Sequence, residues 1–159
     1  MNDYIQRLRL KLGQDSFIHP AARIIIENDD GQILFIRRQD NGLLGLPAGS
    51  MEANESIEEC IRREVREETG LRLLQLEVIG ISSHPEREGV VYPNGDAIQY
   101  FTIEFYSNQW EGSISIQDAV EVTTACFLDP IHCQQLPPNE QSTFESWQYF
   151  QRHQRIFLR

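Results

Sequence analysis

The sequence predicts an α/β fold in which a mixed β-sheet is covered by helices. Three observations support this fold class. Runs of β-branched and aromatic residues, such as AARIIIE at 21–27 and AIQYFTIEFYS at 97–107, are typical of strands. Other segments carry apolar residues at helical spacing. The strand-like runs outnumber the helical ones and are interleaved with them, which favours a sheet with helices packed against it.

The first third of the chain predicts a helix followed by a β-hairpin. A helix is expected over about residues 3–13, where apolar residues recur at helical spacing before a glycine. A buried strand at 21–27 is followed by the turn sequence NDDG at 28–31 and by a returning strand at 32–38. Residues 39–55 are rich in Gly, Pro and Asn and are therefore expected to form a loop.

The clearest helix of the chain is predicted at residues 56–69. Ser56 and Glu59 match the S-x-x-E capping box, in which each side chain accepts a hydrogen bond from the other residue's backbone. Gly70 stands where a helix commonly ends, because glycine adopts the left-handed conformation without strain.

The rest of the chain alternates strands with a final helix. Residues 71–82, 97–107 and 121–128 are β-rich, and an amphipathic helix is expected over about residues 139–154, after two prolines. No repeat, low-complexity tract or linker interrupts the pattern. The whole chain, 1–159, is therefore expected to form a single domain.

Composition limits the functions that the chain can have. Apolar residues make up 40% and charged residues 24%, which is typical of a globular protein. The formal net charge of −10, without a basic patch, argues against a nucleic-acid partner. No apolar run is long enough to span a membrane, and the first residues lack the apolar stretch of a signal peptide. With three cysteines and no CxxC pair, we expect a cytoplasmic protein without a membrane partner.

Three glutamates share one face of the predicted 56–69 helix. Glu64, Glu67 and Glu68 stand at i, i+3 and i+4, where like charges repel by roughly 0.2–0.5 kcal/mol per pair. Ile57 and Ile61 lie on the same face, so these carboxylates border the apolar stripe. Carboxylate oxygens at the edge of a core suit Mg²⁺, which also binds substrate phosphates. The alternative is a solvated acidic face without function.

The segment 49–71, GSMEANESIEECIRREVREETGL, favours the metal-binding alternative. It matches the pattern G-x5-E-x7-R-E-U-x-E-E-x-G-U, in which U is aliphatic. The matching residues are Gly49, Glu55, Arg63, Glu64, Val65, Glu67, Glu68, Gly70 and Leu71. This segment resembles the Nudix box, and the preceding LGLPAGSME resembles the family's L-P-G-G lead-in, with Ala48 in place of a glycine. The resemblance implies the Nudix fold, an α/β/α sandwich with a mixed β-sheet.

The resemblance implies a role for each residue of the box. The three glutamates of the shared face would ligate Mg²⁺, with Mn²⁺ as a substitute and the backbone carbonyl of Ala48 as a further ligand. Glu55 and Arg63 would pair to hold the loop against the helix, and Gly49 would permit the tight entry to the loop. The predicted catalytic residues are Glu64, Glu67, Glu68, Glu121, Arg63 and Glu55. The predicted metal ligands are Glu64, Glu67, Glu68 and Ala48.

Outside the box, an additional acid is expected just before the strand at 121–128. Glu121 is preferred as base or extra ligand, and Asp118 is the alternative; both could instead simply face solvent. The turn-rich loop at 84–96 is expected to contact substrate, although it could equally be an ordinary hairpin with its turn at Asn94–Gly95. The predicted substrate-binding residues are Tyr92, Asn94, Asp96 and Arg37.

The leading prediction is a Mg²⁺-dependent pyrophosphohydrolase that cleaves a nucleoside diphosphate linked to a group X, with ADP-ribose as the first candidate. One alternative is a pyrophosphatase that removes nucleoside triphosphates, including oxidised ones. An alternative of another class is a Nudix-fold nucleotide-binding regulatory module without catalysis, which the intact box disfavours. RNA decapping is disfavoured by the net charge of −10. The expected partner is a small nucleotide-like substrate, and a homodimer is left open.

Overall fold

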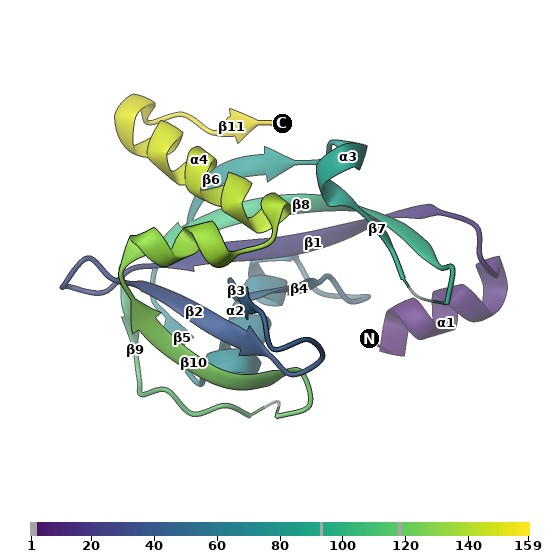
Figure 1. Ribbon diagram of the computed structural model, residues 1–159, viewed down its shortest axis with the longest axis horizontal. Helices are drawn as coiled ribbons and strands as arrows, with labels where there is room; N and C mark the ends of the chain where they lie inside the picture. The colour runs from purple at the N-terminus through teal and green to yellow at the C-terminus, as the bar shows by residue number, and fades with distance from the viewer. Residues whose placement is uncertain (1–2, 93, 118) are drawn as a thin grey trace.

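The computed structural model describes residues 3–92, 94–117 and 119–159. Within these ranges a six-stranded mixed sheet has the order β11-β6-β8-β1-β4, and β7 also pairs with β8 (Figure 1). Its long central strands, β1 and β8, run parallel along their whole length. The strands are β1 (Phe17–Ile26), β4 (Ala48–Ser50), β6 (Glu77–Ser82), β7 (Gly89–Val91), β8 (Ala97–Ser107) and β11 (Phe157–Leu158).

Within the same described residues, a second sheet has the order β10-β2-β3, and β5 pairs with β9 in a short ribbon. The strands are β2 (Ile33–Arg38), β3 (Leu44–Gly45), β5 (Arg72–Leu73), β9 (Trp110–Glu111) and β10 (Val122–Leu128). The helices are α1 (Asp3–Leu12), α2 (Ile57–Thr69), α3 (Pro85–Glu88) and α4 (Pro138–His153), with a 3-10 helix at Pro130–Gln135.

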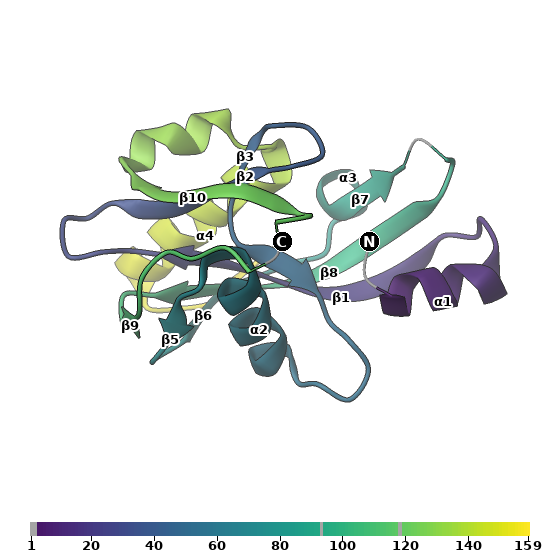
Figure 2. The same ribbon diagram turned by 90° about the horizontal axis from the view of Figure 1, so that it is seen from below.

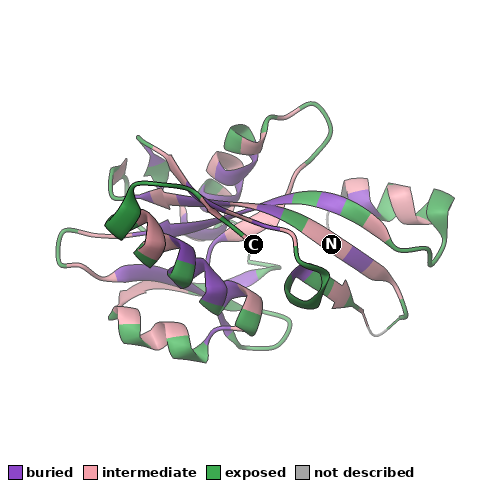
Figure 3. Cartoon of the chain, turned by 90° about the horizontal axis from the view of Figure 1, so that it is seen from above, coloured by how far each residue is buried: buried purple, intermediate pink, exposed green. Residues whose placement is uncertain are grey.

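Helices α2 and α4 cover opposite sides of the strands, which confirms the predicted α/β/α arrangement (Figure 2). Strand β1 alternates between two cores: Ile24 and Ile26 pack with α2, whereas Ile25 packs with α4. Strand β2 does the same, with Leu34 in the α2 core and Phe35 in the α4 core. Figure 3 shows the buried residues concentrated along these strands. None of the helices in the described residues has the length and apolar character needed to cross a membrane.

The predicted hairpin of β1 and β2 is only partly correct. The turn forms, since Asn28 N–H donates to the Gln32 carbonyl at 3.0 Å and Glu27 bridges to Ile33. Beyond that bridge the two strands separate, and β2 pairs with β10 and β3 in the second sheet. The physical reason is burial: both strands are apolar on both faces, and a two-stranded hairpin could not cover four apolar faces.

The expected helices form where the sequence places them, whereas two expected loops contain short elements. The Ser56 hydroxyl accepts from Glu59 N–H at 3.2 Å, the Glu59 carboxylate accepts from Ser56 N–H at 2.7 Å, and Gly70 ends α2 at φ 78°. Strand β1 begins at Phe17, earlier than expected. Segment 39–55 contains β3 and β4, and segment 84–96 contains α3 and β7. These short strands lack an apolar alternation of their own and form because longer strands pair with them.

Candidate functional site

Helix α2 presents three glutamates beneath the strand β4. Glu64 and Glu68 are buried, at 8% and 5% exposure, because their side of the helix faces the body of the protein. Glu67 lies at the rim, with 42% of its side chain exposed. Two buried carboxylates and one accessible carboxylate therefore lie along a single helix, four residues apart or closer.

The segment that leads into α2 is tied to the sheet and to the helix by its backbone. The Pro47 carbonyl accepts from Ile24 N–H of β1 at 3.0 Å. The next residue, Ala48, donates its N–H to Oε2 of Glu68 at 3.1 Å. This bond satisfies one oxygen of a buried carboxylate and places the Ala48 backbone directly against the acidic face of α2.

Gly49 allows the backbone of β4 to pass close to Glu64. A Cβ added at residue 49 would lie 2.0 Å from both Cδ and Oε1 of Glu64, a separation that no side chain tolerates. The φ angle of Gly49 is not in the left-handed region, so the requirement for glycine comes from close approach and not from backbone conformation.

Arg63 joins the loop to the helix, as the residue pattern suggested, and also contacts the glutamates. Its guanidinium donates to both oxygens of Glu55, at 2.8 and 3.1 Å, and to the Ser50 carbonyl at 3.2 Å. The other terminal nitrogen donates to Glu64 at 2.7 Å and to Glu67 at 3.3 Å. The arginine therefore both holds the loop and partly neutralises the acidic face.

The surroundings of the two buried carboxylates disfavour their charged form. Burial raises the pKa of Glu64 to about 7, and the nearby charges of Glu67 and Glu121 add to this effect. Arg63 works in the opposite direction without cancelling it. Burial also raises the pKa of Glu68 well above its usual value, and the charge of Glu64 raises it further. A cation close to these buried, mutually repelling carboxylates would stabilise their charged form.

The donor set fits a divalent metal ion. Among the residues that the structure describes, no three His, Cys, Asp or Glu side chains already surround a common point as a metal cage, and Glu64 and Glu67 are turned towards Arg63 instead. The oxygen donors and their uncompensated charge nevertheless match the preference of Mg²⁺ and Mn²⁺ for carboxylates. A bound cation would compete with Arg63 for these oxygens.

Of the two acids considered outside the box, Glu121 lies close to the acidic face. It is exposed and directly precedes β10, and its backbone carbonyl accepts from Gln39 N–H at 2.8 Å. Its negative charge contributes to the raised pKa values of both Glu64 and Glu68. Asp118 lies outside the described residues.

Both arginines at the end of β2 bond to the β2–β3 loop. Arg37 donates to the Gly42 carbonyl at 2.7 Å. Arg38, whose side chain is 47% exposed, pairs with Asp40 at 3.2 Å. Arg38 also borders the segment that leads into α2, since a Cβ on Gly45 would lie 3.8 Å from its Cδ, and the sequence analysis did not assign it this place. Strand alternation could have selected it, because residues two apart share a face and Leu34 of β2 packs in the α2 core.

The predicted substrate-binding loop is the tip of the β7–β8 hairpin, beside α1 (Figure 1). The Tyr92 and Tyr100 hydroxyls are 2.9 Å apart. Asn94 Nδ2 donates to Asp96 Oδ2 at 2.9 Å, and Arg9 of α1 pairs with Asp96 at 3.5 Å. Asn94 and Asp96 thus shape the turn and hold α1, and the structure does not bring them into contact with the α2 glutamates.

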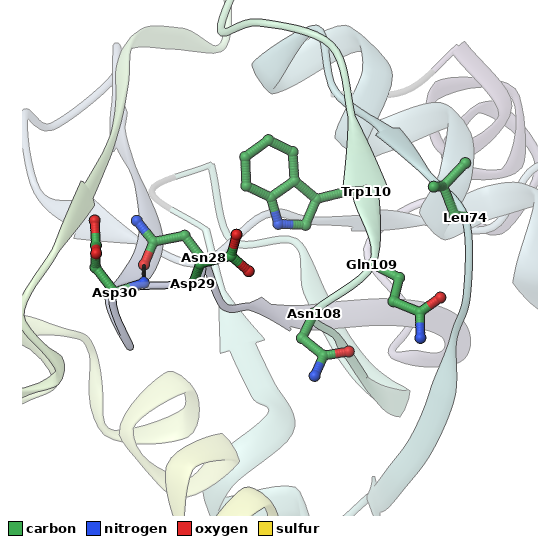
Figure 4. Close-up of a pocket in the computed structure, with 7 residues that line it drawn as sticks. All are labelled: Asn28, Asp29, Asp30, Leu74, Asn108, Gln109 and Trp110. Carbon is green, nitrogen blue, oxygen red and sulfur yellow. Dashed lines mark hydrogen bonds between the residues drawn. The ribbon is translucent and has the colours of Figure 1, made fainter.

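A surface hollow lies elsewhere, at the β1–β2 turn and the start of β9 (Figure 4). Its lining includes Asp29, Asp30 and Trp110, and none of the described site residues predicted from the sequence lines it. The Trp110 indole N–H donates to the Glu27 carbonyl at 3.0 Å, so its polar atom already has a partner. The hollow is separate from the acidic face of α2.

Comparisons with known proteins agree with this fold and with the box. The pattern of the NUDIX domain matches residues 17–153. The ADP-ribose pyrophosphatase of Methanocaldococcus jannaschii is 39% identical over 87 residues, which are 52% of this chain and 48% of that protein. The putative 8-oxo-dGTP diphosphatase of Bacillus subtilis is 38% identical over 66 residues, 42% of this chain and 44% of that protein. Each match spans less than half of the relative's length.

Solved structures show the same fold at lower identity. The NUDIX domain of Shewanella oneidensis NrtR, crystallised with ADP ribose, superposes with a TM-score of 0.66 at 19% identity. The superposition covers 96% of this chain and 99% of that domain. At this identity the likeness concerns the fold alone. With the match over 17–153, this chain belongs to the NUDIX domain family.

Proposed function

We propose that this chain is a pyrophosphohydrolase that uses Mg²⁺, or Mn²⁺ in its place, to cleave a phosphoanhydride bond in a nucleoside diphosphate linked to a group X. The observation that carries the proposal is the pair of buried carboxylates, Glu64 and Glu68, on the acidic face of α2. Burying two carboxylates in the same place is costly unless a cation compensates their charge. A divalent cation does so and also provides a binding point for phosphate oxygens.

In this proposal the chain's residues hold and orient the reacting groups. Glu64, Glu67 and Glu68 would hold the cation, together with the Ala48 backbone carbonyl. When bound, the cation neutralises phosphate oxygens and lowers the pKa of its water. Glu121, exposed beside the buried pair, accepts a proton from the attacking water.

Arg63 has two tasks in the proposed site. Through Glu55 and the Ser50 carbonyl it holds the loop in register with α2. Through Glu64 and Glu67 it orients carboxylate oxygens at the edge of the acidic face. Positioning and charge stabilisation are most of what cleavage of a phosphoanhydride requires of a protein.

ADP-ribose is the first candidate substrate. The M. jannaschii relative, which is named an ADP-ribose pyrophosphatase, supports this choice because it matches the chain at 39% identity over a stretch of 87 residues. A second candidate is a nucleoside triphosphate, including an oxidised one. The B. subtilis relative named a putative 8-oxo-dGTP diphosphatase supports it at almost the same identity, 38%.

A substrate panel separates the two candidates by their products. The protein is incubated with Mg²⁺ and either ADP-ribose, other nucleoside diphosphate derivatives, 8-oxo-dGTP or the ordinary triphosphates. We expect AMP and ribose 5-phosphate from ADP-ribose, with a higher kcat/KM than for any triphosphate. Release of pyrophosphate and a monophosphate as the preferred reaction would replace the first candidate with the second. A Glu68→Gln variant, which we expect to have kcat lowered by on the order of 100-fold on every substrate, serves as the control for contaminating phosphatases.

A further inference from the structure

Glu140, in the first turn of α4, reaches the segment that leads into the acidic site. Its Oε2 accepts a hydrogen bond from Leu46 N–H at 2.6 Å, across 94 positions of the chain. Both residues are buried, Glu140 at 8% and Leu46 at 1% exposure. A charged acceptor makes a stronger bond than a neutral one, and a buried N–H without an acceptor is unfavourable. This contact therefore holds the backbone at Leu46 against α4.

Three consecutive residues of this segment are each bound to a different element. Leu46 N–H is bound to Glu140 of α4, and the Pro47 carbonyl is bound to β1. Ala48 N–H is bound to Glu68 of α2 at 3.1 Å. The position of Ala48 against Glu68 thus depends on how Leu46 and Pro47 are held. Of the three attachments, the one to Glu140 is made by a side chain outside the box.

The charges around Glu140 connect it to the same site. Arg23, which is 6% exposed, donates to the Asn139 carbonyl at 3.0 Å and so lies at the start of α4. Burial raises the pKa of Glu140, and the charges of Arg23 and Arg38 oppose this rise. Glu140 and Arg38 both border the start of the segment, since a Cβ on Gly45 would lie 3.4 Å from Oε2 of Glu140 and 3.8 Å from Cδ of Arg38. Glu140 and Glu68 therefore bind two residues of one backbone segment, Leu46 and Ala48.

We propose that Glu140 is a positioning residue for the carboxylate site: by holding Leu46 N–H, it fixes the Leu46–Ala48 segment and so sets Ala48 against Glu68. The proposal rests on the proposed function only for its effect on catalysis. The structural part concerns the order of a backbone segment and the affinity of the site for a cation, both of which can be measured without any substrate.

Hydrogen exchange tests the structural part. In Glu140→Ala, which removes the acceptor, we expect the amide hydrogens of Leu46 and Ala48 to exchange at least 10-fold faster than in the wild type. Glu140→Gln retains an oxygen that accepts from Leu46, so it should restore most of the protection. Ser146→Ala is the matched control, because the Ser146 hydroxyl is also a buried donor on α4 but bonds to Glu104, at 2.6 Å.

Cation binding and kinetics test the consequence for the site. We expect Glu140→Ala to raise the dissociation constant for Mn²⁺, measured by calorimetry without substrate, by about 10-fold. It should lower kcat by about 10-fold with little change in KM, because a misplaced backbone affects positioning more than substrate affinity. Glu140→Gln should lie close to the wild type in both measurements, and Ser146→Ala should change neither.

The outcomes separate this proposal from the proposed function. If Glu140→Ala matches Ser146→Ala in the exchange of the Leu46 and Ala48 amides and in Mn²⁺ affinity, the positioning role is wrong. If exchange and Mn²⁺ affinity change as expected while the wild type hydrolyses nothing in the substrate panel, the positioning role stands and the proposed function is wrong. Tm is measured for Glu140→Ala and Ser146→Ala, so that a difference in amide exchange can be distinguished from a difference in global stability.

Discussion

Gly49 and Glu64 are packed so closely that any side chain at position 49 would require the Glu64 carboxylate to move. A Cβ there would lie 2.0 Å from the carboxylate carbon of Glu64. We expect Gly49→Ala to displace this carboxylate and to lower kcat by on the order of 100-fold. Wild-type kcat in Gly49→Ala would show that the position of Glu64 is not critical.

The acidic face predicts that a divalent cation both activates and stabilises the protein. Activity should disappear in excess EDTA and return with Mg²⁺ or Mn²⁺. Mn²⁺ should also raise Tm, because a ligand that binds only the folded state stabilises it. In Glu68→Gln we expect kcat to fall by on the order of 100-fold and the Mn²⁺-dependent rise in Tm to shrink.

The same Glu68→Gln variant distinguishes a metal ligand from a structural glutamate. In EDTA its Tm should equal or exceed that of the wild type, since a buried and poorly compensated charge has been removed while the amide oxygen still accepts from Ala48. A variant that loses activity only because it unfolds, with a much lower Tm in EDTA, would assign Glu68 a structural role. Calorimetric scans with and without Mn²⁺ give both quantities.

Arg63 and Glu55 should behave as a coupled pair. We expect Arg63→Ala and Glu55→Gln each to lower both Tm and kcat, and the double variant to lose less than the sum of the two single losses. Arg63→Ala should lose more kcat than Glu55→Gln, because Arg63 also contacts Glu64 at 2.7 Å. The surface variant Arg62→Ala, whose partner Glu58 is 58% exposed, is the control and should change kcat little. Additive losses would contradict the pairing.

Because the His19 imidazole is buried, we expect the protein to lose stability at acidic pH. The imidazole is 2% exposed, lies between Tyr4 of α1 and Tyr100 of β8, and its Nε2 has no partner among the described residues. Burial lowers the pKa of His19, against a smaller opposite effect of the Met51 backbone. The unfolded chain therefore binds the proton more readily, and stability present above about pH 6.5 is lost as the pH falls.

Thermal scans of the wild type and of His19→Phe between pH 7.5 and 5.0 measure this contribution. Phenylalanine does not titrate and keeps an aromatic ring in the cluster with Phe17 and Tyr100. We expect the Tm of the wild type to fall further over this range than the Tm of the variant. Parallel curves would mean that His19 does not contribute to the pH dependence.

The elements of the fold could be predicted where neighbouring residues in the sequence determine them. Helix α2 has its capping box and its terminal glycine within the chain's own sequence, so its ends follow from a few neighbouring residues. The pairing of strands was not predictable in the same way. Strand β1 pairs with β8 in parallel, joining Phe17 to Ile98, and no local pattern identifies such a distant partner. The predicted hairpin is accordingly correct at its turn and not along its strands.

The candidate site likewise contains residues that the local sequence could identify and residues that only the tertiary fold brings together. The residues of the box lie on one helix and its leading loop, so their spacing alone brings them together. Arg38 and Glu140 come from a strand and a helix that only the tertiary fold brings near Leu46–Ala48. Glu104 of β8 is similar: it is fully buried, and Arg159 donates to both of its oxygens, at 2.6 and 2.7 Å.

Tyr92 tests whether the β7–β8 hairpin selects the substrate. The predicted role was stacking on a base, but its hydroxyl is 2.9 Å from that of Tyr100, which gives the ring a place in the hairpin itself. If the exposed part of the ring stacks on substrate, Tyr92→Ala should raise KM for a nucleotide more than it lowers kcat, because stacking is equal in the ground and transition states. Tyr92→Phe, which keeps the ring and loses only the hydroxyl, should retain the wild-type KM.

A substrate without a base provides the remaining comparison for Tyr92. A stacking ring affects only substrates that contain a base, so KM for a diphosphate ester of ribose alone should be the same in Tyr92→Ala and in the wild type. A ring that only packs the hairpin gives a different pattern: Tm falls in Tyr92→Ala while KM stays unchanged for every substrate. In that case the base is bound elsewhere, and the loop between β2 and β3, at residues 39–43, is the next segment to test, because Arg38 at its start interacts with the charge of Glu68.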